Sequence, residues 1–388
     1  MMTVINGQAP FDVVRTAAWW LVPKQLFDGE KLRSGLAVRI ADGKIDNVLP
    51  AEEAGRDGLP VWHTTSLASP GFFDIQVNGG GGVLFNTNPT ADGLRMIAAA
   101  HRNGGTTALL PTLITDAPEV MEAAVDAILD VVGSEGIVGV HLEGPHISLE
   151  RKGAHDPRFI RRMDDKTISA VERLRRAGVP VLLTLAPECV PPGTIEALCT
   201  MGVVVSIGHT AADAPTTRAA IAEGARSVTH LYNAMTPITS REPGVVGAAL
   251  DSDLYCGFIA DGHHVHDIVL RLAVRSRPVA DRMVLVSDAM PTWNGPDHFS
   301  LYGETVRLEG GKLVNRIGSL AGVHIDMATS LRRLVVTVGI PLEEALKMAT
   351  ANPSRLMRLQ ERVGFLRPGM PADIVLLDWA TIASDEGA

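Results

Sequence analysis

Short apolar runs alternate with stretches of helical periodicity through the middle of the chain, from about residue 70 to residue 360. Runs of this length, bounded by turn residues, are typical of buried strands. They cover residues 72–77, 106–114, 137–142, 179–185, 203–207, 226–229, 255–260 and 283–287. Eight strands with helical crossovers predict an α/β fold, a (β/α)8 TIM-like barrel, in preference to a doubly wound sheet.

The segments between these runs have the spacing of amphipathic helices. The helices are predicted at 94–102, 118–132, 167–178, 216–225 and 266–277, and two more at 327–338 and 342–349 complete the barrel wall.

The two ends of the chain have a different pattern, in which apolar and polar residues alternate over short stretches. Residues 35–50 predict two strands joined by a hairpin turn at Asp42-Gly43. Residues 363–378 have the same texture. We therefore expect a small β-sandwich domain built from residues 1–65 plus 361–388, with the barrel domain, residues 66–360, inserted between them.

Four of the predicted barrel strands end on a side chain that can bind metal or transfer protons. These are Glu143, His209, His230 and Asp288. The carboxyl ends of barrel strands meet on one face, so the four side chains are expected at one mouth. Two imidazoles and a carboxylate suit a single divalent metal, and Asp288 is then the general base. Taken singly, each also fits a structural role, as a buried hydrogen-bonded histidine, a turn cap or a helix N-cap.

Three loops add candidates. The glycine run at 79–82 lacks the following Lys-Ser/Thr of a P-loop and is predicted to be a turn. The loop after the sixth strand carries Asn233 and Arg241, and a guanidinium there suits a carboxylate or phosphate. The histidines at 263–266 lack the carboxylates of a second metal site, although one is expected to face the mouth.

The composition restricts the kinds of partner and cellular compartment to be expected for the chain. The hydrophobic fraction of 46% fits a globular core, and no apolar run approaches the roughly 20 residues of a membrane span. A net charge of −9 argues against nucleic acid. Three cysteines without CxxC spacing indicate neither a disulfide framework nor a zinc ribbon. With no signal-peptide pattern at the start, the expected location is cytoplasmic.

An ordered set of motifs covers nearly the whole chain. It comprises PGFFDIQVNGGGG, HLEGPH followed by KGAHD, GHT, THLYNAM with REPG, IADGHHVH, VSDA, GSLAGV and GFLRPGMPADIVLLD. In this order and spacing the set resembles the N-acetylglucosamine-6-phosphate deacetylases of the amidohydrolase superfamily.

The resemblance implies a distorted barrel with a β-sandwich from both termini, and hydrolysis of N-acetyl-D-glucosamine 6-phosphate to glucosamine 6-phosphate and acetate. It implies one divalent metal per subunit on Glu143, His209 and His230, expected to be zinc, with iron, cobalt or manganese as alternatives. Asp288 is implied as the acid/base. The implied substrate contacts are His155, Asn233, Ala234, Arg241, His264, Leu320, Ala321, Gly322 and Val323. A homodimer is also implied, in which Arg241 reaches the neighbouring subunit's site and binds phosphate.

Two departures from the family pattern bear on the site. The first strand ends in Gln76-Val77-Asn78 where amidohydrolases commonly carry His-x-His. Amides are poor metal ligands, so one metal is expected, with Gln76 hydrogen-bonding a water. Val323 replaces a small hydroxyl residue, and Trp293 adds bulk to a predicted lid loop.

The alternatives are deacetylation of a related sugar such as N-acetylgalactosamine 6-phosphate, or a catalytically silent binding homologue. A hydantoinase or dihydroorotase is disfavoured because the fourth strand ends in LAPE, without the lysine that bridges two metals.

Overall fold

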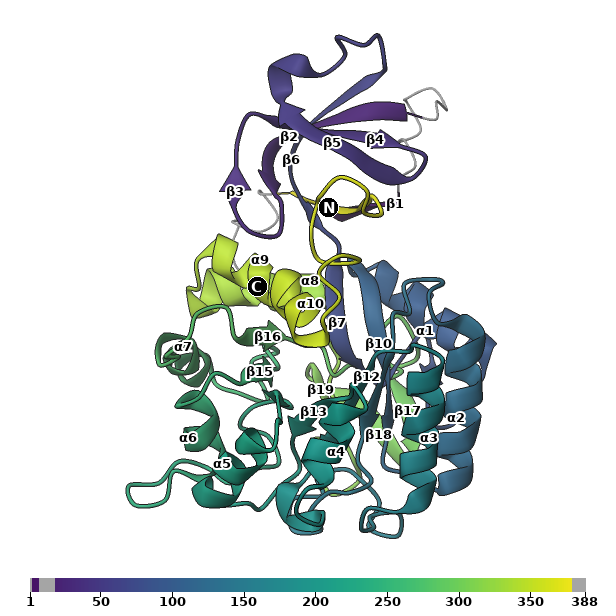
Figure 1. Cartoon of the computed structure of the whole chain (residues 1–388), viewed down its shortest axis with the longest axis vertical. Coiled ribbons are helices and arrows are strands. Elements are labelled where there is room, and N and C mark those ends of the chain that lie inside the picture. Colours follow the sequence, from purple (N-terminus) through teal and green to yellow (C-terminus); the bar gives the residue numbers. More distant parts are fainter. Residues whose placement is uncertain (1, 7–17, 379–388) are drawn as a thin grey trace.

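Eight parallel strands form the central barrel of the computed structural model, which describes residues 2–6 and 18–378 (Figure 1). Every strand predicted for the barrel is confirmed, with shorter bounds in most cases. The hydrogen-bonded order is β16-β15-β14-β13-β12-β11-β10-β7. The strands are β7 Phe72–Val77, β10 Thr106–Ile114, β11 Val140–Glu143, β12 Val181–Leu185, β13 Val204–Ile207, β14 Ser227–Val228, β15 Tyr255–Phe258 and β16 Met283–Leu285.

The barrel closes between its first and last strands without a regular ladder. Val77 forms a single parallel bridge with Ala289, four residues beyond the end of β16. The amide of Asp288 donates to the carbonyl of Gln76 at 2.9 Å. Closure therefore occurs at the carboxyl ends of the strands, at the mouth where the candidate site residues were expected.

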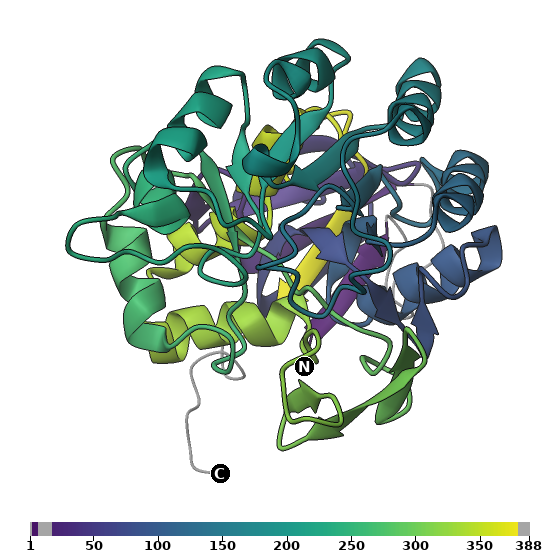
Figure 2. The same cartoon turned by 90° about the horizontal axis from the view of Figure 1, so that it is seen from below.

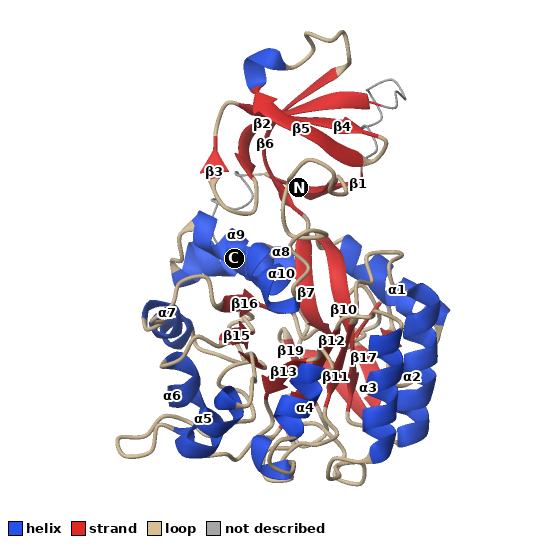
Figure 3. Ribbon diagram, viewed as in Figure 1, coloured by secondary structure: helices blue, strands red, loops and turns tan. Residues whose placement is uncertain are grey.

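Helices cover the outside of the barrel (Figure 3). The predicted helices are confirmed as α1 Ala91–Arg102, α2 Pro118–Val131, α3 Asp165–Arg176, α5 Ala214–Ala222, α7 Asp267–Arg275, α8 Met327–Arg333 and α9 Leu342–Ala349. A π-helical turn, Leu334–Val338, continues α8. Three short helices were not predicted, namely α4 Thr194–Thr200, α6 Gly244–Leu250 and α10 Ala351–Met357.

Helix α10 closes the end of the barrel that faces the small domain. Its Leu356 and Met357 join the apolar cluster that contains Leu110, Leu182 and Val204 from the strands. Figure 1 shows α8 to α10 between the barrel strands and the small domain. The open mouth is thus at the opposite end, seen from below in Figure 2.

The small domain contains strands from both ends of the chain, as predicted. Its seven-stranded sheet has the order β1-β20-β6-β2-β4-β5, with β3 paired to β2. These are β1 Met2–Asn6, β2 Ala18–Phe27, β3 Leu32–Arg33, β4 Leu36–Ala41, β5 Lys44–Pro50, β6 Val61–Pro70 and β20 Asp373–Leu377. The Asp42-Gly43 hairpin joins β4 to β5, whose pairing shifts register once, between Arg39 and Ile40.

The sheet of the small domain folds over its own core. Val38 of β4 and Ile374 of β20 belong to one apolar cluster although two strands separate them in the hydrogen-bonded order. Ile45 also exchanges backbone hydrogen bonds with Gly369 and Met370, which brings β5 to the segment before β20. This arrangement agrees with the expected sandwich. The boundaries at residues 65 and 360 stay a prediction, and β6 continues to Pro70.

Two small sheets beside the mouth were not predicted as sheets. The glycine run forms the hairpin of β8 Gly79–Gly80 and β9 Val83–Leu84, which confirms the predicted turn. A three-stranded sheet of β17 His298–Leu301, β18 Glu304–Glu309 and β19 Lys312–Val314 lies between β16 and α8 in the chain (Figure 2). Among the described residues, no helix is long and apolar enough to cross a membrane.

Candidate active site

The structure brings three of the predicted strand-end side chains into direct contact. His230 Nε2 lies 2.9 Å from Glu143 Oε1 and 3.0 Å from His209 Nε2. His209 Nε2 lies 3.3 Å from the same glutamate oxygen. Four-coordinate zinc with bonds of about 2.0–2.1 Å separates its ligand atoms by roughly 3.3 Å. The three atoms therefore have the donor types and nearly the spacing that a single divalent cation requires.

A backbone feature at the strand ends aims these side chains inward. His209, His230 and Asp288 have φ angles of +47°, +31° and +52°. Left-handed conformations are uncommon for residues other than glycine and concentrate at functional sites. Each of the three strands thus turns sharply at the residue whose side chain enters the mouth.

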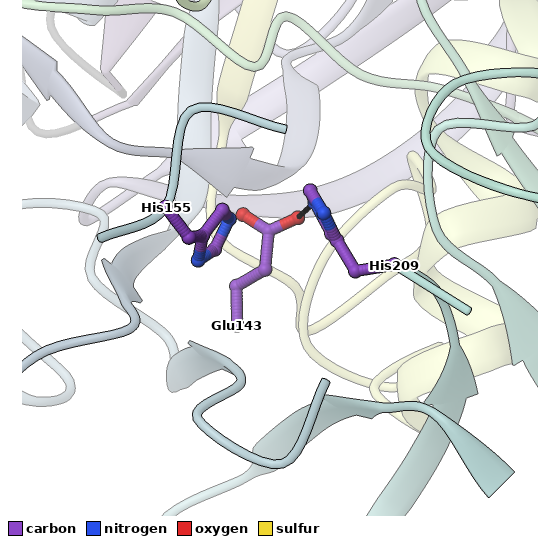
Figure 4. A group of neighbouring side chains, drawn as sticks. All are labelled: Glu143, His155 and His209. Carbon is purple, nitrogen blue, oxygen red and sulfur yellow. Dashed lines mark ion pairs between the residues drawn. The ribbon is translucent and has the colours of Figure 1, made fainter. Parts of the chain in front are cut away.

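His155, from the loop after β11, approaches the same carboxylate. The ligand atoms of Glu143, His155 and His209 lie within 4.8 Å of one another, and Figure 4 shows the two histidines on opposite sides of the glutamate. The Thr115 amide donates to His155 Nδ1 at 3.3 Å. Because Nδ1 accepts this bond, neutral His155 carries its proton on Nε2. His209 is fixed through the Arg151 carbonyl, 2.9 Å from its Nδ1, which leaves His209 Nε2 for a cation.

Burial and mutual charge set the protonation states. Burial alone would raise the pKa of Glu143, but hydrogen bonds from His209 and His230 hold the pKa well below its usual value. For His230, burial lowers the pKa, but the hydrogen bond and charge of Glu143, together with the charge of Asp288, raise the pKa above its usual value. Burial lowers the pKa of His155 well below its usual value, with His209 adding to the effect, so His155 is neutral. Burial, reinforced by the charge of Glu143, raises the pKa of Asp288 to about 6.

Two carboxamides at the end of β7, Gln76 within the strand and Asn78 directly after it, face these carboxylates. Gln76 Nε2 donates to Glu143 Oε1 at 3.1 Å, and Asn78 Nδ2 donates to Asp288 Oδ1 at 2.6 Å. The sequence interpretation gave Gln76 a role in holding water and gave Asn78 none. The signal that could have found Asn78 is its position two residues after Gln76, because alternate residues of a strand face the same side.

A cavity of about 210 Å³ lies over these groups. Most of the predicted substrate contacts line it, namely His155, Asn233, Ala234, His264, Leu320 and Gly322. His264 is the member of the histidine cluster that faces it, held by Asp261 Oδ2 at 2.7 Å from its Nδ1. Ile114, Ile259 and Met290 supply apolar wall that the sequence interpretation did not include.

Other predicted residues lie away from the cavity lining. Arg241 is exposed on the loop between β14 and α6. Ala321 and Val323 are buried at 2% and 1% exposure in neighbouring apolar clusters. Trp293 accepts a hydrogen bond from Gly81 through its carbonyl, and its ring stands 5.8 Å from that of His324. Its loop therefore packs on the glycine hairpin, and Met290 is the nearby residue that reaches the cavity.

Comparison with known proteins identifies the family to which the chain belongs. Residues 67–386 match the amidohydrolase family. The chain belongs to that family. This amidohydrolase is 43% identical over 319 residues to an N-acetylgalactosamine-6-phosphate deacetylase of Shewanella sp. (strain ANA-3), covering 81% of this chain and 80% of the relative. It is 33% identical over 346 residues to an N-acetylglucosamine-6-phosphate deacetylase of Haemophilus influenzae, covering 88% and 90%.

Solved structures extend the likeness to the whole fold. The N-acetylglucosamine-6-phosphate deacetylase of Pasteurella multocida superposes with a TM-score of 0.86 at 32% identity, covering 92% of this amidohydrolase and 95% of that chain. A mutant of the Mycobacterium smegmatis deacetylase, in complex with N-acetyl-D-glucosamine-6-phosphate, gives a TM-score of 0.84 at 32% identity, covering 95% and 97%.

Proposed function

We propose that this amidohydrolase removes the acetyl group of N-acetyl-D-glucosamine 6-phosphate and releases glucosamine 6-phosphate and acetate. The observation that carries the proposal is the convergence of Glu143, His209, His230 and Asp288 on one cavity. A catalytically silent homologue would not need a buried carboxyl group with a pKa of about 6 beside three potential metal ligands, nor the left-handed backbone that carries it at Asp288.

N-acetylgalactosamine 6-phosphate is the second candidate substrate. The relative named for that epimer is 43% identical to this chain, against 33% for the Haemophilus influenzae relative named for the gluco sugar. The two substrates differ in the configuration of one hydroxyl, so the same catalytic groups serve both.

Glu143, His209 and His230 are the proposed ligands of one divalent metal, zinc first and iron, cobalt or manganese next. When bound, such an ion supplies Lewis acidity, which polarises the amide carbonyl and makes water easier to deprotonate. His155 is the other nearby imidazole. We assign it to the substrate, because its Nε2–H can donate to the carbonyl oxygen as negative charge develops there.

Asp288 transfers the proton. A water molecule attacks the carbonyl carbon while Asp288 accepts one of its protons. The C–N bond then breaks, and Asp288 returns that proton to the leaving nitrogen. Its carboxylate ends the cycle ionised, as it began. A pKa near 6 places the group close to neutrality, where it can perform both transfers.

The phosphate requires a cation that the cavity itself does not supply. Within the described part of the chain, its lining contains histidines but no lysine or arginine. We propose that His264 contacts the phosphate and that Arg241 of the partner subunit completes its site in a homodimer. Exposed apolar side chains on the loops around the mouth support such an interface, among them Leu149 at 61% and Ile238 at 54% exposure.

Gln76 also keeps its proposed role of hydrogen-bonding a water, beside its contact with Glu143. A cytoplasmic location is proposed as well, and the three unpaired cysteines are compatible with a reducing compartment.

The test is acetate release from a panel of N-acetylated hexosamines with and without 6-phosphate, together with the metal content of the purified protein. We expect acetate from the 6-phosphates and one bound metal ion per chain, and the ratio of kcat/KM between the two epimers assigns the sugar. Absence of both metal and acetate would refute the enzyme assignment.

A further inference from the structure

A buried threonine lies behind His155, on the side away from the catalytic cavity. Thr115 directly follows β10 and is 1% exposed. Its hydroxyl oxygen lies 2.7 Å from His155 Nδ1 and 3.2 Å from the Glu143 carbonyl oxygen. Its backbone amide donates to the same His155 nitrogen at 3.3 Å. Two groups of one residue therefore converge on Nδ1, and Nε2 is the ring nitrogen that is left for a ligand in the cavity.

These contacts select one tautomer of His155. A backbone N–H can only donate, so Nδ1 has to accept. The Thr115 hydroxyl has a single proton, and the nearer of its two acceptors is this nitrogen. If Nδ1 instead carried the proton and donated to the hydroxyl, the buried Thr115 amide would face another N–H and lose its acceptor, which is costly. Neutral His155 therefore has its proton on Nε2.

The fold holds Thr115 in place independently of any ligand. The Tyr302 hydroxyl, from the turn between β17 and β18, donates to the Thr115 carbonyl at 2.5 Å. The Asn86 side chain accepts from the Ile114 amide at 3.1 Å and donates to the Ile114 carbonyl at 2.9 Å. Gly144 leaves room for the threonine, since a Cβ there would lie 2.2 Å from Thr115 Oγ1. The three-stranded sheet beside the mouth thus helps to fix the residue that contacts His155.

We propose that Thr115 is the positioning residue for His155, holding its imidazole in the Nε2–H tautomer with that N–H directed at the acyl oxygen of the substrate. The inference rests on the role proposed above for His155 in deacetylation. In the other tautomer, or after rotation of the ring, an unprotonated nitrogen would face the oxygen on which negative charge develops. The contribution of Thr115 therefore appears in the transition state more than in substrate binding.

Thr115→Val tests the positioning role because it keeps the shape of the side chain and removes the hydroxyl. Loss of a whole oxyanion donor costs about 10²- to 10³-fold in kcat, and we expect about 10- to 100-fold here, because the amide still donates to Nδ1. KM should change little, and Thr115→Ser should recover most of the activity. In a His155→Ala background, Thr115→Val should cause no further loss. A loss of the same size in that background would overturn the proposal.

Thr112→Val is the matched control. Thr112 lies on β10 as well, is fully buried, and its hydroxyl oxygen is 3.2 Å from His141 Nδ1. Neither of these two residues lines the catalytic cavity. The control should lower Tm and leave kcat near the wild-type value. An equal fall of kcat in the control would show that loss of any buried threonine hydroxyl on this strand has the same effect, and would refute the specific role of Thr115.

NMR spectroscopy of the imidazole nitrogens gives a readout that depends neither on the substrate nor on the folding of the Thr115 variants. It is measured on the wild-type protein dialysed against Zn²⁺, which is diamagnetic, and the His155 signals are identified by their absence from His155→Ala. We expect a protonated Nε2 and an unprotonated Nδ1. A protonated Nδ1 overturns the inference even if acetate is released. If the tautomer is as expected and no acetate is released, the proposed function falls and the tautomer assignment is kept.

Discussion

Replacing Gly322 by alanine tests whether the loop before α8 shapes the substrate cavity. Gly322 has a φ of +92°, and a Cβ there would lie 2.3 Å from Met290 Cγ and 2.6 Å from its Cε. A left-handed alanine costs about 1–2 kcal/mol, and overpacking adds typically about 1–3 kcal/mol. We therefore expect Gly322→Ala to lower the free energy of unfolding by about 2–5 kcal/mol.

The same substitution should raise KM. Gly322 and Met290 both line the cavity, and Met290 is only 4% exposed, so the displaced side chain has little room except over the substrate. Urea denaturation measures the stability change, and acetate release measures KM and kcat. We expect KM to rise several-fold with a smaller change in kcat, since the added Cβ meets the Met290 side chain and not Asp288 or the proposed metal ligands.

Gly339→Ala is the control that separates the cost of a left-handed alanine from the cost of the contact with Met290. Gly339 has a φ of +79°, but a Cβ there would meet no atom within 4 Å. The free energy of unfolding of this control should fall by about 1–2 kcal/mol, and its KM should be unchanged. Equal destabilisation of the two variants would show that the Met290 contact does not matter, and an unchanged KM in Gly322→Ala would refute the proposed role in shaping the cavity.

The remaining predictions concern charge and metal. Asp288→Asn should keep metal and substrate binding, measured by elemental analysis and calorimetry, but lose about 10²- to 10⁴-fold in kcat, and near-normal turnover would remove it as acid/base. Arg241→Ala should raise KM for phosphorylated sugars alone. Mixed with Asp288→Asn, it should recover about a quarter of wild-type activity through heterodimers, and no recovery would exclude a contribution across the interface. Burial raises the pKa of Asp74 to about 7 from 3.8, so native Asp74 holds its proton between those values and stability falls as pH rises through that window. Asp74→Asn should reduce that fall in urea titrations at pH 4 to 8, and an identical slope would contradict the assignment. A chelator should lower Tm and abolish acetate release, one equivalent of metal should restore both, and a requirement for two would contradict a single site.

The barrel strands could be predicted because they are buried on both faces and therefore stand out as apolar runs. The exact ends of these strands could not be predicted, because the residue at which a strand begins to pair depends on its neighbours in the sheet. The run at 137–142 forms a ladder only from Val140, and Ile137 makes one isolated bridge with Leu109. Helices α6 and α10 were missed because Gly247 and Pro353 weaken the local pattern, and packing against the barrel overrides that preference.

The three-stranded sheet beside the mouth was also missed, although its pattern is visible in retrospect. Burial alternates in β17 from exposed His298 to buried Leu301, and Gly310-Gly311 forms the turn before β19. In the site, the strand-end position of the ligands and Asp288 followed from local sequence. The pairing of Asn78 with Asp288 did not, because it depends on how the barrel closes.

The contact that closes the barrel, between β7 and the segment after β16, makes catalysis depend on completion of the fold. Asn78 and Asp288 are 210 positions apart in the chain, and until the last strand arrives β7 has no partner on that edge. Contacts of such long sequence separation form slowly and leave an exposed strand edge in the meantime. During synthesis from the N-terminus, Glu143, His209 and His230 all emerge before Asp288 does. A partly synthesised chain can therefore contain all of its proposed metal ligands while it still lacks Asp288. Hydrolysis accordingly requires the closed barrel.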